Sequence, residues 1–311
     1  MRSNRISPVG SSQTKDGNFN WSSLHHQIPK NSCAHPVLTQ FRYILVGFFG
    51  ERGMWGKGWL MVLGLILAWM LPAEAAVTLR VLLTQTNGVL HVGSSTQARV
   101  IDPYGRVVMR IPPMRRVQSQ VSGGQVVLGG YQAPFLWVQP EAGGYVYVGD
   151  GWYRGRLLLL ARHGLSAINY VDLEEYLYSV VGAEMYPHWP ASALQAQAVA
   201  ARSYAVTKRI QPVDKYYDLG PTERHQVYKG LRSEQPSTRA AVNATRGQIL
   251  TYKGGVVLSQ YAANDDIVRN VFGGRGMSQQ RAYELAKQQY NYLQILGYFY
   301  PGTHLGRIRG Y

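Results

Sequence analysis

The chain has 311 residues, of which 46% are hydrophobic. This length and composition suffice for one or two globular cores and exclude disorder along the whole chain. Its 32 Lys and Arg residues exceed its 17 Asp and Glu residues, which gives a net charge of +15. The basic residues are scattered and lack the dense runs of nucleic-acid-binding tails, so a polyanionic surface is a candidate partner and nucleic acid is not expected.

The cysteine content limits the metal chemistry of the protein. A single cysteine, Cys33, excludes an intramolecular disulfide framework and any cysteine-rich zinc module. A metal site would have to be built from His and carboxylate side chains. We expect neither a metal nor another cofactor.

An uncharged apolar run, Trp59–Leu71, indicates where in the cell the protein is sent. It is shorter than the roughly 20 residues that a membrane-spanning helix needs. Lys57 supplies a positive charge before it, and Ala73 and Ala75 supply small residues at the positions that a signal peptidase reads. The run is therefore typical of the core of a signal peptide, and an uncleaved membrane anchor is the alternative.

These features define the expected N-terminal end of the exported protein. A signal peptide over 54–75 would start at Met54, which makes residues 1–53 a non-native extension of the gene start that contains Cys33. Cleavage before Ala76 leaves 25 basic and 14 acidic residues, a net charge of +11. Signal peptide and anchor alike put this part outside the cytoplasm, so we expect a periplasmic or extracellular location in the cell envelope. Contact with the membrane is expected only through the signal segment.

Short runs of β-branched and aromatic residues alternate with turn residues from Val77 to about Tyr170. This alternation predicts strands. Asp102–Gly105 places Pro and Gly where a tight turn needs them and predicts a hairpin between its two flanking runs. Residues 77–150 are thus expected to form a β-rich module with a structural or substrate-contacting role. The predicted strands are Thr78–Leu82, Ala98–Ile101, Arg106–Arg110, Phe135–Val138, Tyr145–Val148 and Tyr153–Leu160.

The hydrophobic period changes at Asp172 to that of an α-helix. Pro187 and Pro190 end this helix, which places Glu184 in its last turn on the buried face. There the helix dipole and the loss of hydration both favour the protonated acid, the form that a general acid needs. The alternative is a solvated glutamate without a catalytic role. The predicted stripe is Leu173, Tyr176, Leu177, Val180, Val181 and Glu184.

The next segment, Ser192–Arg209, is rich in strong helix formers and contains six alanines. It predicts a helix that neighbouring backbones approach closely, and therefore a central one. Arg202 interrupts its small-residue face and is suited to pair with a carboxylate. The predicted fold class is α+β, with a β-rich N-terminal module followed by a core around this alanine-rich helix.

A series of short motifs runs from about Trp152 to Ile308. They are Tyr153–Gly155, Ile168–Asn169, Val171–Leu177, Val180–Met185, Trp189–Pro190, Leu194–Ala205, Gln226–Gly230, Ala240–Gly247, Gly276–Gln279, Ala282–Tyr283, Leu285–Ala286, Ile295–Leu296 and Tyr298–Thr303. Together they resemble the SpoIID/LytB domain family, typified by stage II sporulation protein D. The resemblance implies a SpoIID-like domain over 151–311 in a secreted protein directed at peptidoglycan glycan strands.

For the sporulation members the resemblance implies a lytic transglycosylase whose catalytic glutamate belongs to a Glu-Met pair, here Glu184 and Met185. Such an enzyme uses one carboxyl group, first to protonate the glycosidic oxygen and then to take a proton from the C6 hydroxyl of the same sugar. No water is consumed, the product has a 1,6-anhydromuramoyl end, and no second carboxylate of the ordinary glycosidase kind is needed. On the same resemblance we assign substrate contacts to Arg202, Tyr204, Gln226, Tyr228, Arg275, Ser278 and Gln279.

The sequence departs from the family pattern in three respects. Gly220 and His225 stand where some relatives carry zinc-binding cysteines, so no zinc is expected by that route and His225 is expected to be a surface or stacking residue. Residues 262–270 pass almost directly into Phe272, where relatives have a longer glycine-rich insertion, so part of a glycan-facing groove is expected to be missing. Arg275 stands near a common histidine and either contacts a sugar or begins the helix that Ser278 caps.

Two other function classes remain open. LytB-type members stimulate a cell-wall amidase, so the same domain can bind the wall as an amidase partner without cutting glycan. A structural envelope protein with an inactive site is the third possibility. A basic surface rich in tyrosine suits binding to acidic polymers and to sugar faces equally well, so composition does not separate these classes.

The first prediction concerns processing. If export begins at Met54, N-terminal sequencing of the mature native protein should start at Ala76 or within a residue or two of it, because the apolar core and small residues before it match signal-peptidase cleavage. Recovery of a cytoplasmic chain that starts at Met1 would contradict this prediction.

Overall fold

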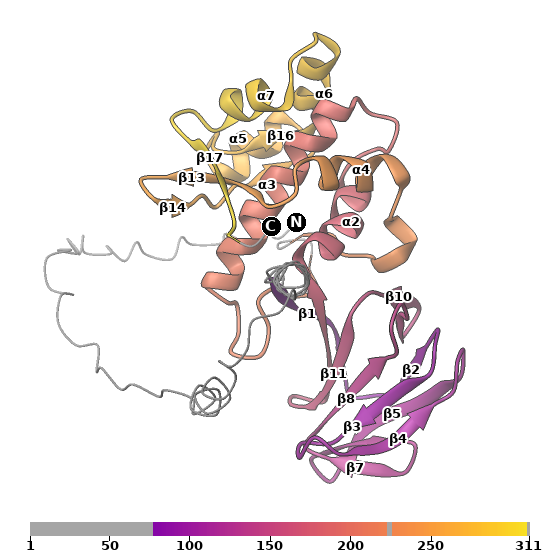
Figure 1. Cartoon of the computed structure of the whole chain (residues 1–311). Coiled ribbons are helices and arrows are strands. Elements are labelled where there is room, and N and C mark those ends of the chain that lie inside the picture. The colour runs from indigo at the N-terminus through magenta and orange to yellow at the C-terminus, as the bar shows by residue number, and fades with distance from the viewer. Residues whose placement is uncertain (1–76, 223–225, 310–311) are drawn as a thin grey trace, which may run out of the picture. The chain divides into compact units, whose positions relative to one another are not determined.

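The computed structural model describes residues 77–222 and 226–309 (Figure 1). They all belong to one compact unit, residues 71–311. The predicted extension 1–53, the predicted signal peptide 54–75 and His225 lie outside the described residues. Within the described ranges, no helix combines the length and the hydropathy that crossing a membrane requires.

The described chain begins with twelve strands, which pair antiparallel in two six-stranded sheets. The strand order is β1-β12-β11-β8-β3-β4 in the first sheet and β10-β9-β2-β5-β6-β7 in the second. The bounds are β1 Thr78–Thr86, β2 Leu90–Ser94, β3 Ala98–Ile101, β4 Val107–Ile111, β5 Arg116–Ser122, β6 Gln125–Leu128, β7 Tyr131–Ala133, β8 Phe135–Pro140, β9 Val146–Val148, β10 Gly151–Tyr153, β11 Arg156–Ala161 and β12 Leu165–Asp172.

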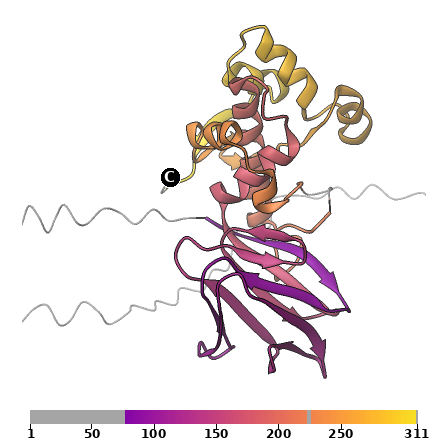
Figure 2. The same ribbon diagram turned by 90° about the vertical axis from the view of Figure 1, so that its right-hand side faces the viewer.

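The two sheets enclose one apolar core between their facing sides. Val92 and Val126 from the second sheet and Val100, Leu136 and Leu157 from the first are fully buried in the same cluster. Alternation along the strands produces this arrangement, because successive side chains point to opposite faces of a sheet. The strand-rich half and the helical half lie at opposite ends of the described unit (Figures 1 and 2).

The predicted hairpin at Asp102–Gly105 is confirmed. Asp102 Oδ1 accepts hydrogen bonds from the backbone N–H groups of Tyr104 and Arg106, both at 2.9 Å, and Gly105 adopts the left-handed conformation with φ +81°. Asx turns of this kind stabilise a chain reversal locally. The carboxylate of Asp102 therefore holds β3 and β4 in register.

The predicted strand Tyr153–Leu160 is divided in the structure into β10 and β11. Gly155 between them has φ +80°, and a Cβ at this position would collide with the backbone carbonyl of Tyr170. A glycine is needed here for both reasons. The break transfers the chain from the second sheet to the first.

The helical half is built around α3, Ala191–Ile210, which confirms the helix predicted over Ser192–Arg209. α3 contacts α2, α4, α6, α7 and β13, and Figure 1 shows it in the centre of this half. The other bounds are α2 Leu173–Glu184, the 3₁₀ helix η1 Gly230–Ser233, α4 Pro236–Ala244, β13 Gln248–Tyr252, β14 Gly255–Val256, β15 Tyr261–Ala262, α5 Asp265–Phe272, β16 Met277–Ser278, α6 Gln279–Lys287, α7 Tyr292–Phe299 and β17 His304–Arg307.

Small side chains explain the central position of α3. Ala196, Ala198, Ala200, Ala201 and Ala205 are all fully buried. Alanine has the highest helix propensity and keeps the helix surface narrow, so several elements can pack around one helix. The prediction that this helix is central is confirmed.

A buried ion pair joins α3 to its neighbours. The Arg202 guanidinium donates to both carboxylate oxygens of Glu174 on α2, with Nε–Oε1 at 2.9 Å and Nη2–Oε2 at 2.7 Å. Their side chains are 0% and 1% exposed. Arg202 also donates to the carbonyls of Val242 and Gln248, at 3.2 and 3.1 Å, and the Gly247 N–H donates to Glu174 Oε1 at 3.1 Å. One arginine thus links α2, α3, α4 and β13.

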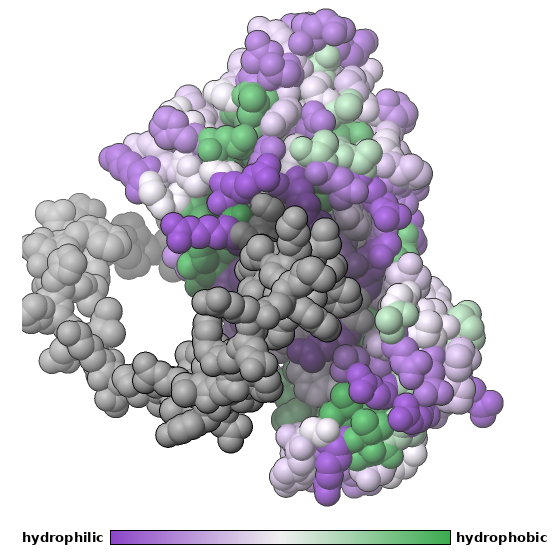
Figure 3. Space-filling view, in the orientation of Figure 1, coloured by the Kyte–Doolittle hydropathy of each residue, from purple (hydrophilic) through white to green (hydrophobic). Residues whose placement is uncertain are grey.

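On the face seen in Figure 3, hydrophilic residues cover most of the surface, and hydrophobic residues form separate patches. Among the exposed large side chains are Tyr104, Tyr186 and Tyr298. A tyrosine at the surface keeps its hydroxyl solvated while its ring offers an apolar face. Of these three, Tyr186 lies at the candidate functional site.

The second prediction concerns the buried ion pair. Replacing Arg202 with Met should lower the free energy of unfolding by about 3–5 kcal/mol, because Glu174 would remain buried without its counter-ion. Chemical denaturation of the two proteins measures the difference. Arg269→Gln, which breaks a pair with Asp266 that is exposed to solvent on both sides, is the control and should leave stability unchanged.

The double variant Arg202→Met with Glu174→Leu separates loss of charge pairing from loss of packing. It should recover part of the stability, since an apolar pair of similar volume removes the unpaired charge. An unchanged stability of the single variant would contradict a structural role for the pair.

Candidate functional site

Helix α2 ends at the candidate catalytic residue. Its N-cap Asp172 accepts a hydrogen bond from the backbone N–H of Glu174 at 2.9 Å, and its last residue is Glu184. The predicted apolar stripe is confirmed, since its five apolar members are 0–1% exposed. Glu184 itself is partly rather than fully buried, because the chain turns to an extended conformation at Met185 and leaves the helix end open.

Two distant segments hold the carboxylate of Glu184. The backbone N–H of Val227 donates to Oε1 at 3.0 Å, and the side-chain amide of Gln279 donates to Oε2 at 3.4 Å. Hydrogen bonds from two other parts of the chain therefore orient this carboxylate at the end of α2. The structure thus places Gln279, one of the predicted contact residues, beside Glu184.

Glu184 lies in a pocket of about 650 Å³. Among the described lining residues it is the only carboxylate, and the amides of Asn264, Gln279 and Gln280 supply further hydrogen-bonding groups. Such a combination of apolar wall and few polar groups is typical of small-ligand sites. The lining residues are Gly182, Ala183, Glu184, Met185, Tyr186, Pro187, Trp189, Ala263, Asn264, Gln279 and Gln280.

A row of aromatic rings lies beside this pocket. The ring centres of Tyr186 and Trp189 are 5.4 Å apart, and those of Trp189 and Tyr283 are 4.8 Å apart. The Tyr186 side chain is strongly exposed. Sequence reasoning did not assign these rings to the site, although Tyr186 precedes Pro187 and Trp189 precedes Pro190 directly after the Glu-Met pair. Two aromatic residues, each before a proline, at the end of a helix were the available signal.

The segment from Tyr261 to Gln279 completes the pocket. β15 and β16 pair in parallel, which places Gln279 next to the segment containing Asn264. Asn264 caps α5 by accepting from the Ile267 N–H at 3.0 Å and also lines the pocket. Between β14, which ends at Val256, and β15, which begins at Tyr261, the chain forms no strand.

Gln226 positions the segment that contacts Glu184. Its Oε1 accepts from the Tyr176 hydroxyl at 3.0 Å, and its Nε2 donates to the Ala201 carbonyl at 3.1 Å and to the Tyr261 hydroxyl at 2.9 Å. Burial raises the pKa of Tyr176 and of Tyr261 well above the usual value, so both hydroxyls stay protonated. Gln226 therefore orients Val227 instead of facing the pocket.

Two predicted contact residues belong to the domain interior. The Tyr228 hydroxyl donates to Asn169 Oδ1 at 2.8 Å, and its ring lies against those of Tyr153 and Tyr176. Tyr204 on α3 is 8% exposed and packs in the same apolar cluster as Tyr176. Neither side chain lines the pocket, because both rings fill space between elements of the core.

Three other predicted contact residues do not line the pocket: Arg202, Arg275 and Ser278. Arg202 is consumed by its pairing with Glu174 and has no exposed surface. Ser278 is 1% exposed and caps α6 by accepting from the Arg281 N–H at 3.2 Å, as the sequence predicts for that helix. Arg275 is exposed in the loop before β16 and is not among the pocket residues. The structure thus brings together Glu184 and Gln279 from the predicted set.

Within 77–222 and 226–309, no group of three or more His, Cys, Asp or Glu side chains is arranged to hold a metal ion. The predicted role of His225 and the predicted protonation state of Glu184 stay predictions.

Comparisons with known proteins match the region that contains Glu184. The sequence model of the stage II sporulation protein family, SpoIID, matches residues 161–252, a range that contains Glu184 and the whole of α2, α3 and α4. The chain is 34% identical over 135 residues to an uncharacterized protein of Brachyspira hyodysenteriae, covering 42% of this chain and 37% of that protein. It is 36% identical over 89 residues to the amidase enhancer of Bacillus subtilis, covering 29% of this chain and 12% of the enhancer. This chain therefore spans much less than half of either relative.

The third prediction concerns Gln226. Replacing Gln226 with Ala should lower the free energy of unfolding by about 1–3 kcal/mol, because the hydroxyls of two buried tyrosines lose a partner. Thermal and chemical unfolding measure this change. Gln120→Ala, at an exposed strand position, is the matched control and should stay within about 0.5 kcal/mol of the parent. Equal effects of both substitutions would contradict the positioning role of Gln226.

Proposed function

We propose that this protein, which carries a SpoIID domain at residues 161–252, is a cell-envelope protein that cleaves peptidoglycan glycan strands as a lytic transglycosylase. The observation that carries the proposal is the carboxylate of Glu184, held at the open end of α2 in a pocket walled by aromatic rings and amides. Peptidoglycan is the proposed substrate, and no cofactor takes part.

In the first step, protonated Glu184 donates its proton to the glycosidic oxygen. The bond between that oxygen and C1 of the muramoyl sugar then breaks, and positive charge develops at C1. General acid catalysis requires the carboxyl group to be within hydrogen-bond reach of the leaving oxygen. Val227 N–H and the Gln279 amide keep the carboxylate pointing into the pocket, which supports this assignment.

In the second step, the C6 hydroxyl oxygen of the same sugar attacks C1 and its proton passes to the Glu184 carboxylate. Glu184 is thereby returned to its starting state, and the product carries a 1,6-anhydromuramoyl end. One carboxyl group performs both proton transfers, in contrast to ordinary glycosidases, which use two. This route requires no activated water.

The aromatic row gives the pocket a means of binding sugars. The rings of Tyr186, Trp189 and Tyr283 present apolar faces next to polar groups, which suits the C–H faces and hydroxyls of pyranose rings. The amides of Asn264 and Gln280 on the pocket lining are suited to bind hydroxyl or acetamido groups. We assign these residues to substrate binding.

The second candidate function is that of a wall-binding modifier of an amidase. The match to the amidase enhancer of Bacillus subtilis favours this function. It spans 89 residues and covers 29% of this chain. In that case the pocket binds wall or partner without cleaving a glycosidic bond. The proposed partner is then a cell-wall amidase.

The fourth prediction tests the transglycosylase. Replacing Glu184 with Gln should lower the release of anhydro-ended product from peptide-free glycan by about 10²–10⁴-fold, since Gln neither donates nor accepts the catalytic proton. Binding to isolated sacculi should stay near the parent level, because the amide oxygen of Gln can still accept from Val227. Mass spectrometry of the products and a sacculus pull-down provide the two measurements.

Glu284→Gln is the control, because Glu284 is a partly exposed carboxylate on α6 paired with Arg281. It should cleave as the parent does. Equal cleavage by the parent and by Glu184→Gln would remove Glu184 from the mechanism. If neither cleaves while both bind sacculi and stimulate a purified amidase, the protein belongs to the modifier class.

A further inference from the structure

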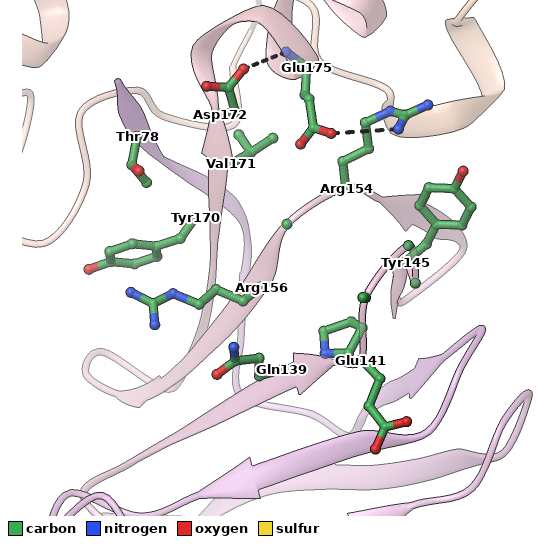
Figure 4. Close-up of a pocket in the computed structure, with 15 residues that line it drawn as sticks. Thr78, Gln139, Glu141, Tyr145, Arg154, Arg156, Tyr170, Val171, Asp172 and Glu175 are labelled. Carbon is green, nitrogen blue, oxygen red and sulfur yellow. Dashed lines mark hydrogen bonds and ion pairs between the residues drawn. The ribbon is translucent and has the colours of Figure 1, made fainter. Parts of the chain in front are cut away.

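A second cleft lies at the other end of α2. Its volume is about 510 Å³, and it is bounded by the end of β8, the loop after it, the start of β11, the end of β12 and the first turn of α2 (Figure 4). Glu175 at this end and Glu184 at the catalytic end are nine residues apart on one helix, or about 14 Å at 1.5 Å per residue. The cleft is therefore separate from the Glu184 pocket.

Arg156 lies in this cleft with its charge uncompensated. Its guanidinium carbon lies 4.3 Å from the Trp137 ring centre and 5.6 Å from that of Tyr170, while the side chain remains exposed. Stacking holds the planar guanidinium and leaves the N–H groups at its edge free to donate. Among the described residues, no carboxylate lies within 4.0 Å of it.

Neighbouring arginines differ from Arg156 in this respect. Arg80 is paired with Asp218, Arg154 with Glu234, and Arg162 with Asp214, at 2.6 to 2.8 Å. Each of those guanidinium groups serves the fold. Arg156 serves no such pair, so its donors are available to a ligand.

The three acidic residues that line the cleft, Glu141, Asp172 and Glu175, form no ion pair with Arg156. Glu175 faces Arg154 instead, at 3.7 Å, and Arg154 is already bound by both carboxylate oxygens of Glu234. Burial raises the pKa of Glu175, so this carboxylate takes up a proton at a higher pH than an exposed glutamate does. Glu141 instead accepts from the Gln97 amide at 3.1 Å and Asp172 caps α2, so Arg156 is the arginine of the cleft that no carboxylate of the described residues holds.

Other cleft groups suit the end of a peptide. The pairing of Leu157 with Val138 places Gln139 opposite Arg156 on neighbouring strands, and the Gln139 amide has no hydrogen-bond partner among the described residues. The loop Ala142–Gly144 forms a wall of small residues, and the rings of Tyr145 and Tyr170 stand on either side of the space (Figure 4). This wall leaves room for small side chains next to the two donors.

We propose that this cleft binds the carboxyl-terminal end of a peptidoglycan stem peptide. The terminal carboxylate takes the forked donors of Arg156, the Gln139 amide bonds the adjacent peptide group, and a terminal alanine methyl packs against Ala142–Gly144. The inference rests on the proposed cell-wall function, because it names the wall component that this cleft recognises. The roughly 14 Å of α2 between Glu184 and Glu175 corresponds to about four extended residues of a peptide.

The fifth prediction is tested by titration calorimetry of the full chain with two soluble probes. One is a stem tetrapeptide that ends in D-alanine, and the other is the same peptide with a carboxyl-terminal amide. The parent should bind the acid about 10- to 100-fold more tightly than the amide, as expected for a charge-assisted hydrogen-bond pair. Arg156→Gln should lose this factor for the acid and should bind the amide as the parent does.

Two controls make the result specific. Arg116 stacks on Tyr147 at 4.0 Å on the other sheet, so Arg116→Gln removes a similar stacked arginine outside the cleft and should bind the acid normally. Arg156→Lys should restore part of the affinity, since it keeps the charge and loses the fork. Thermal unfolding of each variant confirms folding.

Equal binding of acid and amide by the parent, or no binding of the acid, would overturn the proposal. So would an equal loss in Arg116→Gln, or displacement of the peptide by inorganic phosphate at equal concentration, which would mark a general anion site. Glu184→Gln should bind the tetrapeptide as the parent does. Failure of glycan cleavage with peptide binding intact would therefore count against the transglycosylase alone, and loss of peptide binding with cleavage intact would count against this cleft alone.

Discussion

The bidentate pair between Arg202 and Glu174 is the interaction on which the arrangement of the helical half depends. Removing both charges from water is costly, and the cost is offset only when their remaining donors and acceptors are satisfied. The carbonyls of Val242 and Gln248 and the N–H of Gly247 meet this requirement. Because these groups lie on different elements, the pair forms only when α2, α3, α4 and β13 are in their final places.

The position of α2 then decides where Glu184 lies. The apolar stripe of α2 packs against α3, and the helix ends where Pro187 prevents its continuation, so the last residue emerges at the edge of the core. Val227 and Gln279 reach that residue from two other parts of the chain. Gln226, held by two buried tyrosines, brings the first of these donors into range. A carboxylate fixed in this way beside aromatic rings suits proton transfer to a bound sugar better than a freely rotating surface glutamate does.

The strand-rich half contributes to the other end of the same helix. β12 leads directly into α2 through Asp172, and β11 pairs with β12, so the first sheet brings Arg156 close to the first turn of α2. The stacking of Arg156 on Trp137 depends on this sheet, because neighbouring strands place both side chains on one face. One helix thus connects the proposed catalytic pocket to the proposed peptide cleft, and the two halves of the described unit share a wall-binding surface in this proposal.

Elements whose cause is local could be predicted from the sequence. The stripe from Leu173 predicts α2, the alanine-rich run predicts α3, Ser278 predicts the start of α6, and Asp102–Gly105 predicts a hairpin, because periodicity, capping and turn chemistry act within a few residues. Glu184 was identified in the same way, from its place in the stripe and from the family motif around it. The partners of these residues became visible only in the folded chain. Glu174 lies 28 residues from Arg202, and Val227 and Gln279 lie 43 and 95 residues from Glu184. Local pattern carries no information on such distances, so it could not show that Arg202 and Tyr228 are consumed by the core or that Tyr283 joins Trp189 at the pocket.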